Sequence, residues 1–183
     1  MEGDLLNKKG PIIVTGCQRS GTTIMTKMIC NDLGFSFHQD DEFQPSLEGI
    51  KQIKLFIKHG ITNIAIQSPL ILYTYDDFYY SIPGIHFVGM KRDKQDIINS
   101  MRRVRWMEEV QQYFWNWEKY LEAHVSHMSA LWEGLKTNLP TEAWTEIEYQ
   151  SLESHPLFIT KDLRTNFTIR QTETYGSKIR ERE

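Results

Sequence analysis

Hydrophobic positions change their spacing several times along this chain, and each spacing predicts an element. Residues 11–16 (PIIVTG) form a short apolar run, rich in β-branched side chains, that ends at a glycine, which is typical of a buried strand. From Ile24 to Leu33 apolar residues recur every three or four positions and stop before Gly34, which predicts an amphipathic helix ended by a left-handed glycine. This region therefore has the order strand, glycine loop, helix.

The rest of the chain alternates between strand and helix patterns in the same way. Residues 35–45 (FSFHQDDEFQP) are interpreted as an acidic and aromatic loop, and the spacing after them predicts a helix that is capped by Ser46 and ends near Gly60. Further on, the pattern predicts strands at 63–69, 85–91 and 143–149, a short helix at 70–82, a helix at 94–104 capped by Asp93, and a long helix from Trp117 to Leu135.

Strands separated by helices indicate parallel βαβ units, so the predicted fold class is α/β, a three-layer parallel sheet flanked by helices. With 183 residues and 40% apolar content, the chain is long enough for one single domain over residues 1–183, with its core at about 11–160 and a polar tail at about 161–183. Ligands of such sheets bind beyond the carboxyl ends of the strands. Three polar segments fall there, at 16–23, 67–69 and 91–93.

Charge and composition exclude some function classes. Lys and Arg total 21 against 24 Asp and Glu, a net charge of -3, which argues against nucleic acid as the main partner. No apolar run approaches the roughly 18 residues needed to span a bilayer, and there is no signal-peptide pattern, so we expect a soluble protein without a membrane segment. The two cysteines, Cys17 and Cys30, are too few for a disulfide framework, which fits a cytoplasmic location.

The loop between the first strand and helix (GCQRSGTT, residues 16–23) has the glycine spacing of a phosphate-binding loop. Backbone N–H groups at a helix start attract an anion, Gly16 and Gly21 permit the tight turn, and Arg19 adds a permanent charge with a planar fork. Hydroxyl donors follow at Ser20, Thr22 and Thr23. A site for an anion is therefore predicted here.

Two familiar uses of such a loop fit poorly. A nucleoside triphosphate loop carries lysine where Thr22 stands, and the following strand ends in Lys91-Arg92 where a magnesium carboxylate is expected, so a kinase or ATPase is disfavoured. A cysteine phosphatase loop needs an arginine six positions after Cys17, where Thr23 stands.

A second anion-binding pattern follows the strand at 85–91. Arg92 lies at the strand end, and Ser100 lies eight positions later, about 10 Å along the next helix, so Arg92 has to fold back to share a ligand with it. A solvated basic helix face is the alternative. Together the two patterns suit a ligand with a phosphate at each end of a ribose.

At these residues the sequence resembles the sulfotransferases that use 3′-phosphoadenosine 5′-phosphosulfate (PAPS), which have a P-loop fold. VTGCQRSGTTIMTKMI is similar to the 5′-phosphosulfate loop of the tyrosylprotein and bacterial branches, with their RSGTT form, and IHFVGMKRDKQDIINSM is similar to the 3′-phosphate motif. IQSPLILYTYDDF and IEYQSLESHP resemble weaker family segments, so that the resemblance covers most of residues 11–160. Three positions depart from the family pattern: Gln67 replaces a frequent lysine, Lys94 a frequent proline, and Gln150-Ser151 an acidic pair.

The resemblance implies in-line transfer of a sulfuryl group from PAPS to a hydroxyl or amine, which leaves adenosine 3′,5′-bisphosphate and needs no metal. It places the donor on the loop and the second motif, and it implies that Arg19 stabilises the leaving group. Because Gln67 replaces the lysine that often has this role in the family, Arg19 or Lys91 would have to perform it. The residues it assigns to the donor are Gly16, Gln18, Arg19, Ser20, Gly21, Thr22 and Thr23 at the phosphosulfate, Arg92 and Ser100 at the 3′-phosphate, and Tyr149 at the adenine.

The general base that activates the acceptor is expected in the segment 38–42 (HQDDE). Glu42 is the first choice and Asp41 the second, with Asp40 and His38 as further candidates, and a merely solvated acidic loop as the alternative. His124 and His127, three residues apart, are interpreted as ordinary surface or core residues, and no metal site is expected.

Two other functions remain open from the sequence: a P-loop nucleoside or nucleotide kinase, and a module that binds PAPS or the bisphosphate without transfer. The acceptor, whether a small molecule, saccharide, lipid or peptide hydroxyl, and the oligomeric state stay open as well.

Overall fold

The computed structural model describes residues 10–40, 43–104, 106 and 116–159. A five-stranded sheet with the order β2-β3-β1-β4-β5 forms the middle layer, and every pair of neighbouring strands is parallel. The predicted α/β fold class is thus confirmed. The strands are β1 (Ile12–Gly16), β2 (Ser36–Gln39), β3 (Ile64–Gln67), β4 (His86–Lys91) and β5 (Trp144–Glu148).

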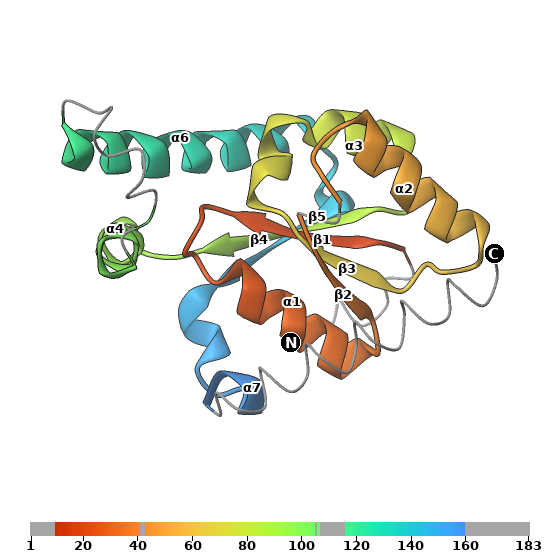
Figure 1. Ribbon diagram of the computed structural model, residues 1–183, viewed down its shortest axis with the longest axis horizontal. Coiled ribbons are helices and arrows are strands. Elements are labelled where there is room, and N and C mark those ends of the chain that lie inside the picture. Colours follow the sequence, from red (N-terminus) through yellow and green to blue (C-terminus); the bar gives the residue numbers. More distant parts are fainter. Residues whose placement is uncertain (1–9, 41–42, 105, 107–115, 160–183) are drawn as a thin grey trace.

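Helices cover both faces of the sheet (Figure 1). The helix that follows β1, α1 (Thr22–Leu33), lies on one face together with the short α7 (Pro156–Ile159). The opposite face carries α2 (Leu47–Lys58), α3 (Tyr75–Ser81) and α6 (Trp117–Asn138). Buried side chains accordingly form two clusters, one on each side of the sheet. Short 3₁₀ helices complete the described part: η2 (Pro69–Tyr73), η3 (Thr141–Ala143) and η4 (Tyr149–Leu152).

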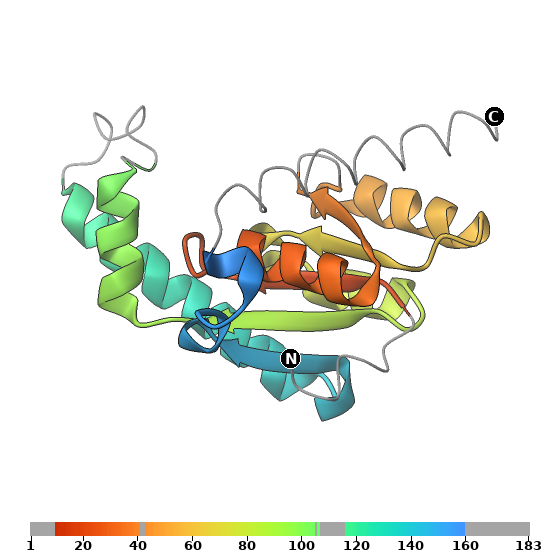
Figure 2. The ribbon, with the colours of Figure 1, turned by 90° about the horizontal axis from the view of Figure 1, so that it is seen from below.

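The strand order creates one position suited to a ligand. From β1 the chain crosses to β2 and β3 on one side, and from β3 it crosses back over β1 to β4 and β5 on the other side. Crevices in open parallel sheets form at the carboxyl ends of strands where the direction of winding reverses, here between β1 and β4. Helix α4 (Lys94–Arg103) projects beyond this edge, next to the first turns of α6 (Figures 1 and 2).

Two predicted segments were wrong: a predicted loop contains a strand, and a predicted helix consists of two elements. The segment interpreted as a loop contains β2, which pairs in parallel with β3 from Ser36↔Ile64 to Gln39↔Gln67. It escapes the hydrophobic pattern because one of its buried faces carries Ser36 and His38, whose side chains bond to each other at 3.0 Å. The single helix expected at 70–82 is two elements, η2 and α3, joined at Thr74, whose backbone (φ -141) is not helical.

The other predicted elements are confirmed, with shifts of a few residues at their ends. Ser46 caps α2 through Gly49 N, and Asp93 caps α4 through Gln95 N and Asp96 N, as expected. In the described ranges, no helix is long and apolar enough to cross a membrane. The polar segment from residue 160 onward lies outside those ranges.

Candidate functional site

The loop between β1 and α1 takes its shape from three residues with positive φ. They are Gly16 (φ 132), Arg19 (φ 70) and Gly21 (φ 104), and the turn is closed by a hydrogen bond of 3.0 Å from Ser20 N to Cys17 O. Arg19 is the one residue other than glycine, among those described, with positive φ. A left-handed backbone at an arginine costs free energy, and such residues cluster at ligand sites.

The start of α1 is free to bind an anion. Its N-cap, Gly21, has no side chain and makes no capping bond, so the first backbone N–H groups of the helix point into the loop without a side-chain partner. Ser20 contributes a hydroxyl that is completely buried and has no hydrogen-bond partner within the described structure. Thr22 is buried beside it and Thr23 is exposed. The first amides of α1 and the Ser20 hydroxyl thus provide several hydrogen-bond donors for an anionic group.

The structure brings the second predicted motif to this loop. Arg19 Nε donates to Ser100 Oγ at 3.3 Å, and Arg92 Nη1 donates to the backbone oxygen of Arg19 at 3.0 Å. Arg92 Nε is buried and has no partner among the described atoms. Arg92 and Ser100 therefore meet at Arg19, although they come from a strand end and from a position well inside α4.

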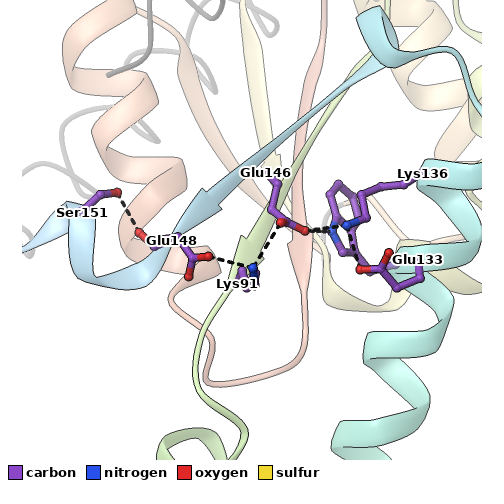
Figure 3. Close-up of polar contacts among 7 residues, drawn as sticks. Lys91, Glu133, Lys136, Glu146, Glu148 and Ser151 are labelled. Atoms are coloured by element: carbon purple, nitrogen blue, oxygen red, sulfur yellow. Dashed lines mark hydrogen bonds and ion pairs between the residues drawn. The ribbon is translucent and has the colours of Figure 1, made fainter.

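Cations around the loop differ in whether a carboxylate neutralises them. Lys91 forms ion pairs with Glu148 at 2.9 Å and with Glu146 at 3.6 Å, which raise the pKa of Lys91 (Figure 3). Arg102 is likewise bound by Glu118. Within the described part of the chain, Arg19, Arg92 and Lys94 have no carboxylate at ion-pair distance. Positive charge at the site is thus left for a ligand, while Lys91 is paired with Glu146 and Glu148, and its role at the leaving group stays a prediction.

Tyr149 packs on the outside of the loop. Its ring lies under the Arg92 guanidinium, with 4.0 Å between the Arg92 Cζ and the ring centroid, and it fills the space where a Cβ on Gly21 would be. One ring face is thus taken by Arg92, and the adenine contact expected for Tyr149 stays a prediction that concerns the rest of the ring.

Two contacts from other elements complete the loop's surroundings. Gln67, at the end of β3, donates from Nε2 to Thr22 Oγ1 at 3.4 Å, so this side chain reaches the loop without bringing a charge. His124 on α6 bonds through Nε2 to Gln18 Oε1 at 2.7 Å. Burial, with a smaller effect of nearby His127, lowers the pKa of His124.

His124 is the residue of this site that the sequence did not reveal. Its ring packs against Trp106 at 4.8 Å between centroids and stacks on Tyr120 at 6.2 Å. No spacing along the chain connects it to Gln18, 106 positions away, and only its place on the apolar stripe of α6 offered a weak signal.

The structure describes two of the four candidate general bases, His38 and Asp40. Because β2 lies two strands from β1, its carboxyl end is about 10 Å from the loop, on the same edge of the sheet. His38 is 6% exposed and packs edge-on against Phe43 and Phe56, which leaves it poor access to an acceptor. Asp40 is half-buried at the edge. Asp41 and Glu42 lie outside the described residues.

Alternative chemistries find little support in the described ranges. They hold no group of three or more His, Cys, Asp or Glu side chains arranged for a metal ion. Asp93, the carboxylate just after β4, is used to cap α4. Burial raises the pKa of the Cys17 thiol to about 12, so a thiolate nucleophile is absent near neutral pH.

Comparison with known proteins identifies the fold. No protein-family model matches the chain, and no curated protein does. A solved sulfotransferase domain from the olefin synthase of Synechococcus PCC 7002 is 13% identical, with a TM-score of 0.53, over 88% of this chain and 74% of that one.

Two solved kinases are similar to the same extent. A sugar kinase from a Janibacter species is 14% identical with a TM-score of 0.52, over 88% of this chain and 91% of that one. A gluconokinase from Sinorhizobium meliloti is 14% identical with a TM-score of 0.50, over 93% of this chain and 98% of that one. At this level of identity the similarity concerns the fold alone, and the chain has the P-loop α/β fold.

Proposed function

We propose that this protein is a sulfotransferase that takes PAPS as the donor and transfers its sulfuryl group to a hydroxyl or amine, leaving adenosine 3′,5′-bisphosphate. The observation that supports this most is the junction of the two anion motifs at Arg19. Ser100 Oγ and Arg92 Nη1 both bond to this one residue, at 3.3 and 3.0 Å, so a ligand with two anionic groups finds both motifs in one place.

The residues present fit such a donor. The N–H groups at the start of α1 and the hydroxyls of Ser20 and Thr22 would hold the 5′-phosphosulfate end, together with Gly16, Gln18 and Thr23 of the loop. Arg92 and Ser100 would hold the 3′-phosphate, since Arg92 Nε is buried without a partner. The bound donor supplies the activated sulfuryl group, and no metal is needed.

The chain's own residues then have three tasks. Arg19 and the α1 amides stabilise the negative charge that develops on the leaving phosphate, and losing one such preorganised donor typically costs about 10²–10³-fold in rate. A carboxylate in the segment after β2, with Glu42 first and Asp41 second, accepts the proton of the acceptor hydroxyl or amine. Arg92 keeps the loop backbone in place through the oxygen of Arg19.

A kinase is the second candidate, because a solved sugar kinase and a solved gluconokinase share the fold. Two features weigh against it. Thr22 takes the position where the triphosphate-binding lysine belongs, and β3 and β4 end in Gln67 and in Lys91-Arg92 rather than in a carboxylate. A kinase would bind ATP only with a divalent ion.

The deciding experiment is calorimetric titration of the protein with adenosine 3′,5′-bisphosphate in EDTA, beside ATP with magnesium. We expect bisphosphate binding in EDTA that weakens at least tenfold in Arg19→Ala and in Arg92→Ala, because each removes charged hydrogen bonds of about 1.5–3 kcal/mol. Arg103→Ala is the control, since Arg103 is exposed and carries the same charge outside the loop.

The other outcomes are equally informative. Binding of magnesium ATP alone would replace the sulfotransferase with a kinase. Bisphosphate binding without sulfuryl transfer to any acceptor tested would indicate a binding module. Equal weakening in Arg103→Ala would mean that only net charge is being measured, and that Arg19 and Arg92 form no specific site.

A further inference from the structure

A cavity of about 490 Å³ lies between α6 and the carboxyl ends of β1 and β4. Small-molecule sites typically have about 300–1,000 Å³, mostly apolar walls and a few polar groups. Gly16 and Cys17 line this cavity, so it reaches the loop from the side of the sheet that α6 covers. Its apolar wall comes from α4 and α6: Ile97, Val125, Met128 and Trp132. Met90 of β4 also lines the cavity, but its side chain packs in the cluster on the α1 side of the sheet.

The two carboxylates that line the cavity, Glu133 and Glu146, are each paired with a lysine (Figure 3). Glu146 accepts hydrogen bonds from Trp132 Nε1 at 2.6 Å and from Lys136 at 3.0 Å, and Lys91 lies 3.6 Å away. Glu133 pairs with Lys136 at 2.7 Å. These groups form one network in the wall of the cavity, and among the described residues both of its carboxylates already have a cationic partner.

Lys94 at the mouth of the cavity is different. Its Nζ donates to Ser126 Oγ at 2.7 Å, and Ser126 Oγ in turn donates to Glu122 O. Across the described ranges Lys94 has no carboxylate at ion-pair distance, and it is exposed. Arg92, which also lines the cavity, has no carboxylate at ion-pair distance among the described residues either. The cavity therefore combines two cations without a described carboxylate partner, Arg92 and Lys94, with the apolar wall of α4 and α6.

We propose that this cavity binds a small amphipathic monoanion, with its alkyl or aryl body against Ile97, Val125 and Trp132 and its head group at Lys94. An apolar body gains free energy by leaving water, and the head group gives Lys94 the counter-charge that the described residues do not supply. The cavity shares Gly16 and Arg92 with the proposed donor site, but the contacts proposed for this ligand come from α4 and α6.

The test uses decanoate as the anionic probe and decanol as its uncharged match, each displacing anilinonaphthalene sulfonate from the full-length protein and followed by fluorescence. Ala130→Trp fills the mouth of the cavity from an exposed position on α6. Ala123→Trp adds the same ring to an exposed position on α6 that does not line the cavity. Lys94→Gln removes the charge, and Lys119→Gln removes a charge elsewhere on the surface.

We expect Ala130→Trp to weaken decanoate binding at least tenfold and Ala123→Trp to leave it unchanged. Lys94→Gln is expected to weaken decanoate binding about tenfold while decanol binding stays the same, because a charged hydrogen bond is lost from one probe only. Equal effects of the two tryptophan variants, or equal effects of Lys94→Gln and Lys119→Gln, would overturn the proposal. So would decanol and decanoate losing affinity together in Lys94→Gln.

Discussion

Gly21 lies directly against the ring of Tyr149, the first residue after β5. Gly21 has φ 104, and an added Cβ would lie 2.6 Å from Cδ2 and 2.9 Å from Cε2 of the Tyr149 ring. We predict that Gly21→Ala destabilises the protein and weakens anion binding at the loop. Both effects follow because the backbone and the ring have to move, and Arg92 rests on that ring at 4.0 Å.

Two costs contribute to the destabilisation. An L side chain in the left-handed region costs about 1–2 kcal/mol, and forcing a methyl group into filled space costs about 1–3 kcal/mol. The free energy of unfolding should therefore fall by about 2–5 kcal/mol. For a chain of this size each kcal/mol shifts the Tm by about 2–4 °C, so the expected loss is roughly 4–20 °C.

Matched variants separate the two costs. Gly134→Ala, in the interior of α6, places its Cβ where no atom lies within 4 Å, and we expect it to leave stability unchanged or to raise it by up to about 1 kcal/mol. In a Tyr149→Ala background, Gly21→Ala should cost only the backbone part, about 1–2 kcal/mol, because the ring is gone.

The assays are urea unfolding followed by fluorescence and titration with adenosine 3′,5′-bisphosphate. A Gly21→Ala protein within about 0.5 kcal/mol of the wild type, with unchanged binding, would refute the reasoning. An equal cost in the Tyr149→Ala background would show that the ring takes no part and that the strain lies in the backbone alone.

Three further predictions concern the groups around the loop. Glu146→Gln tests the acidic pH dependence: burial opposes ionisation of Glu146, but hydrogen bonds from Trp132 and Lys136 outweigh it and lower its pKa below the ordinary 4.5. Above about pH 5, the free energy of unfolding of the wild type should thus exceed that of the variant by roughly 1 kcal/mol, and this difference should disappear as the pH falls through the lowered pKa. Urea unfolding at several pH values measures it, and a constant difference down to about pH 2 would contradict the prediction. Asp93→Ala should cost about 1 kcal/mol of unfolding free energy, because Asp93 Oδ1 caps α4 at 2.9 and 3.1 Å, while Asp93→Asn should cost little; equal losses in both variants would argue against capping. Gln67→Lys should raise sulfuryl release from PAPS tenfold or more, because it brings a cation to within reach of Thr22, whereas Gln67→Met should not; no gain in single-turnover assays would count against the proposed transfer.

Much of the fold could be predicted from the chain because the spacing of apolar residues is a local property. The alternation of strand and helix patterns predicted the α/β class, and Ser46 and Asp93 cap the helices that follow them as expected. The strand β2 escaped this reasoning. Ser36 and His38 bond to each other on a buried face, where Phe56 of α2 packs edge-on against His38, and the sequence pattern of β2 shows neither contact.

The candidate site likewise has features that the sequence predicts and features that depend on the tertiary structure. The sequence by itself determined the glycine loop, the arginines and the hydroxyls, since these are the residue types that bind anions at a helix start. Which cations remain available was decided only by the tertiary structure. Lys91 meets Glu146 and Glu148 because β4 and β5 are neighbours in the sheet, whereas no carboxylate of the described chain lies at ion-pair distance from Arg19.

Contacts between distant segments were likewise beyond the sequence. Ser100 reaches Arg19 across 81 positions, and His124 reaches Gln18 across 106. These pairs form because the crossover from β3 to β4 and the long α6 return the chain to the carboxyl edge of β1, a consequence of strand order. Local spacing determined which residues are able to bind an anion, and the packing of the sheet determined which of them meet, because strand order is a property of the whole core and of no single segment.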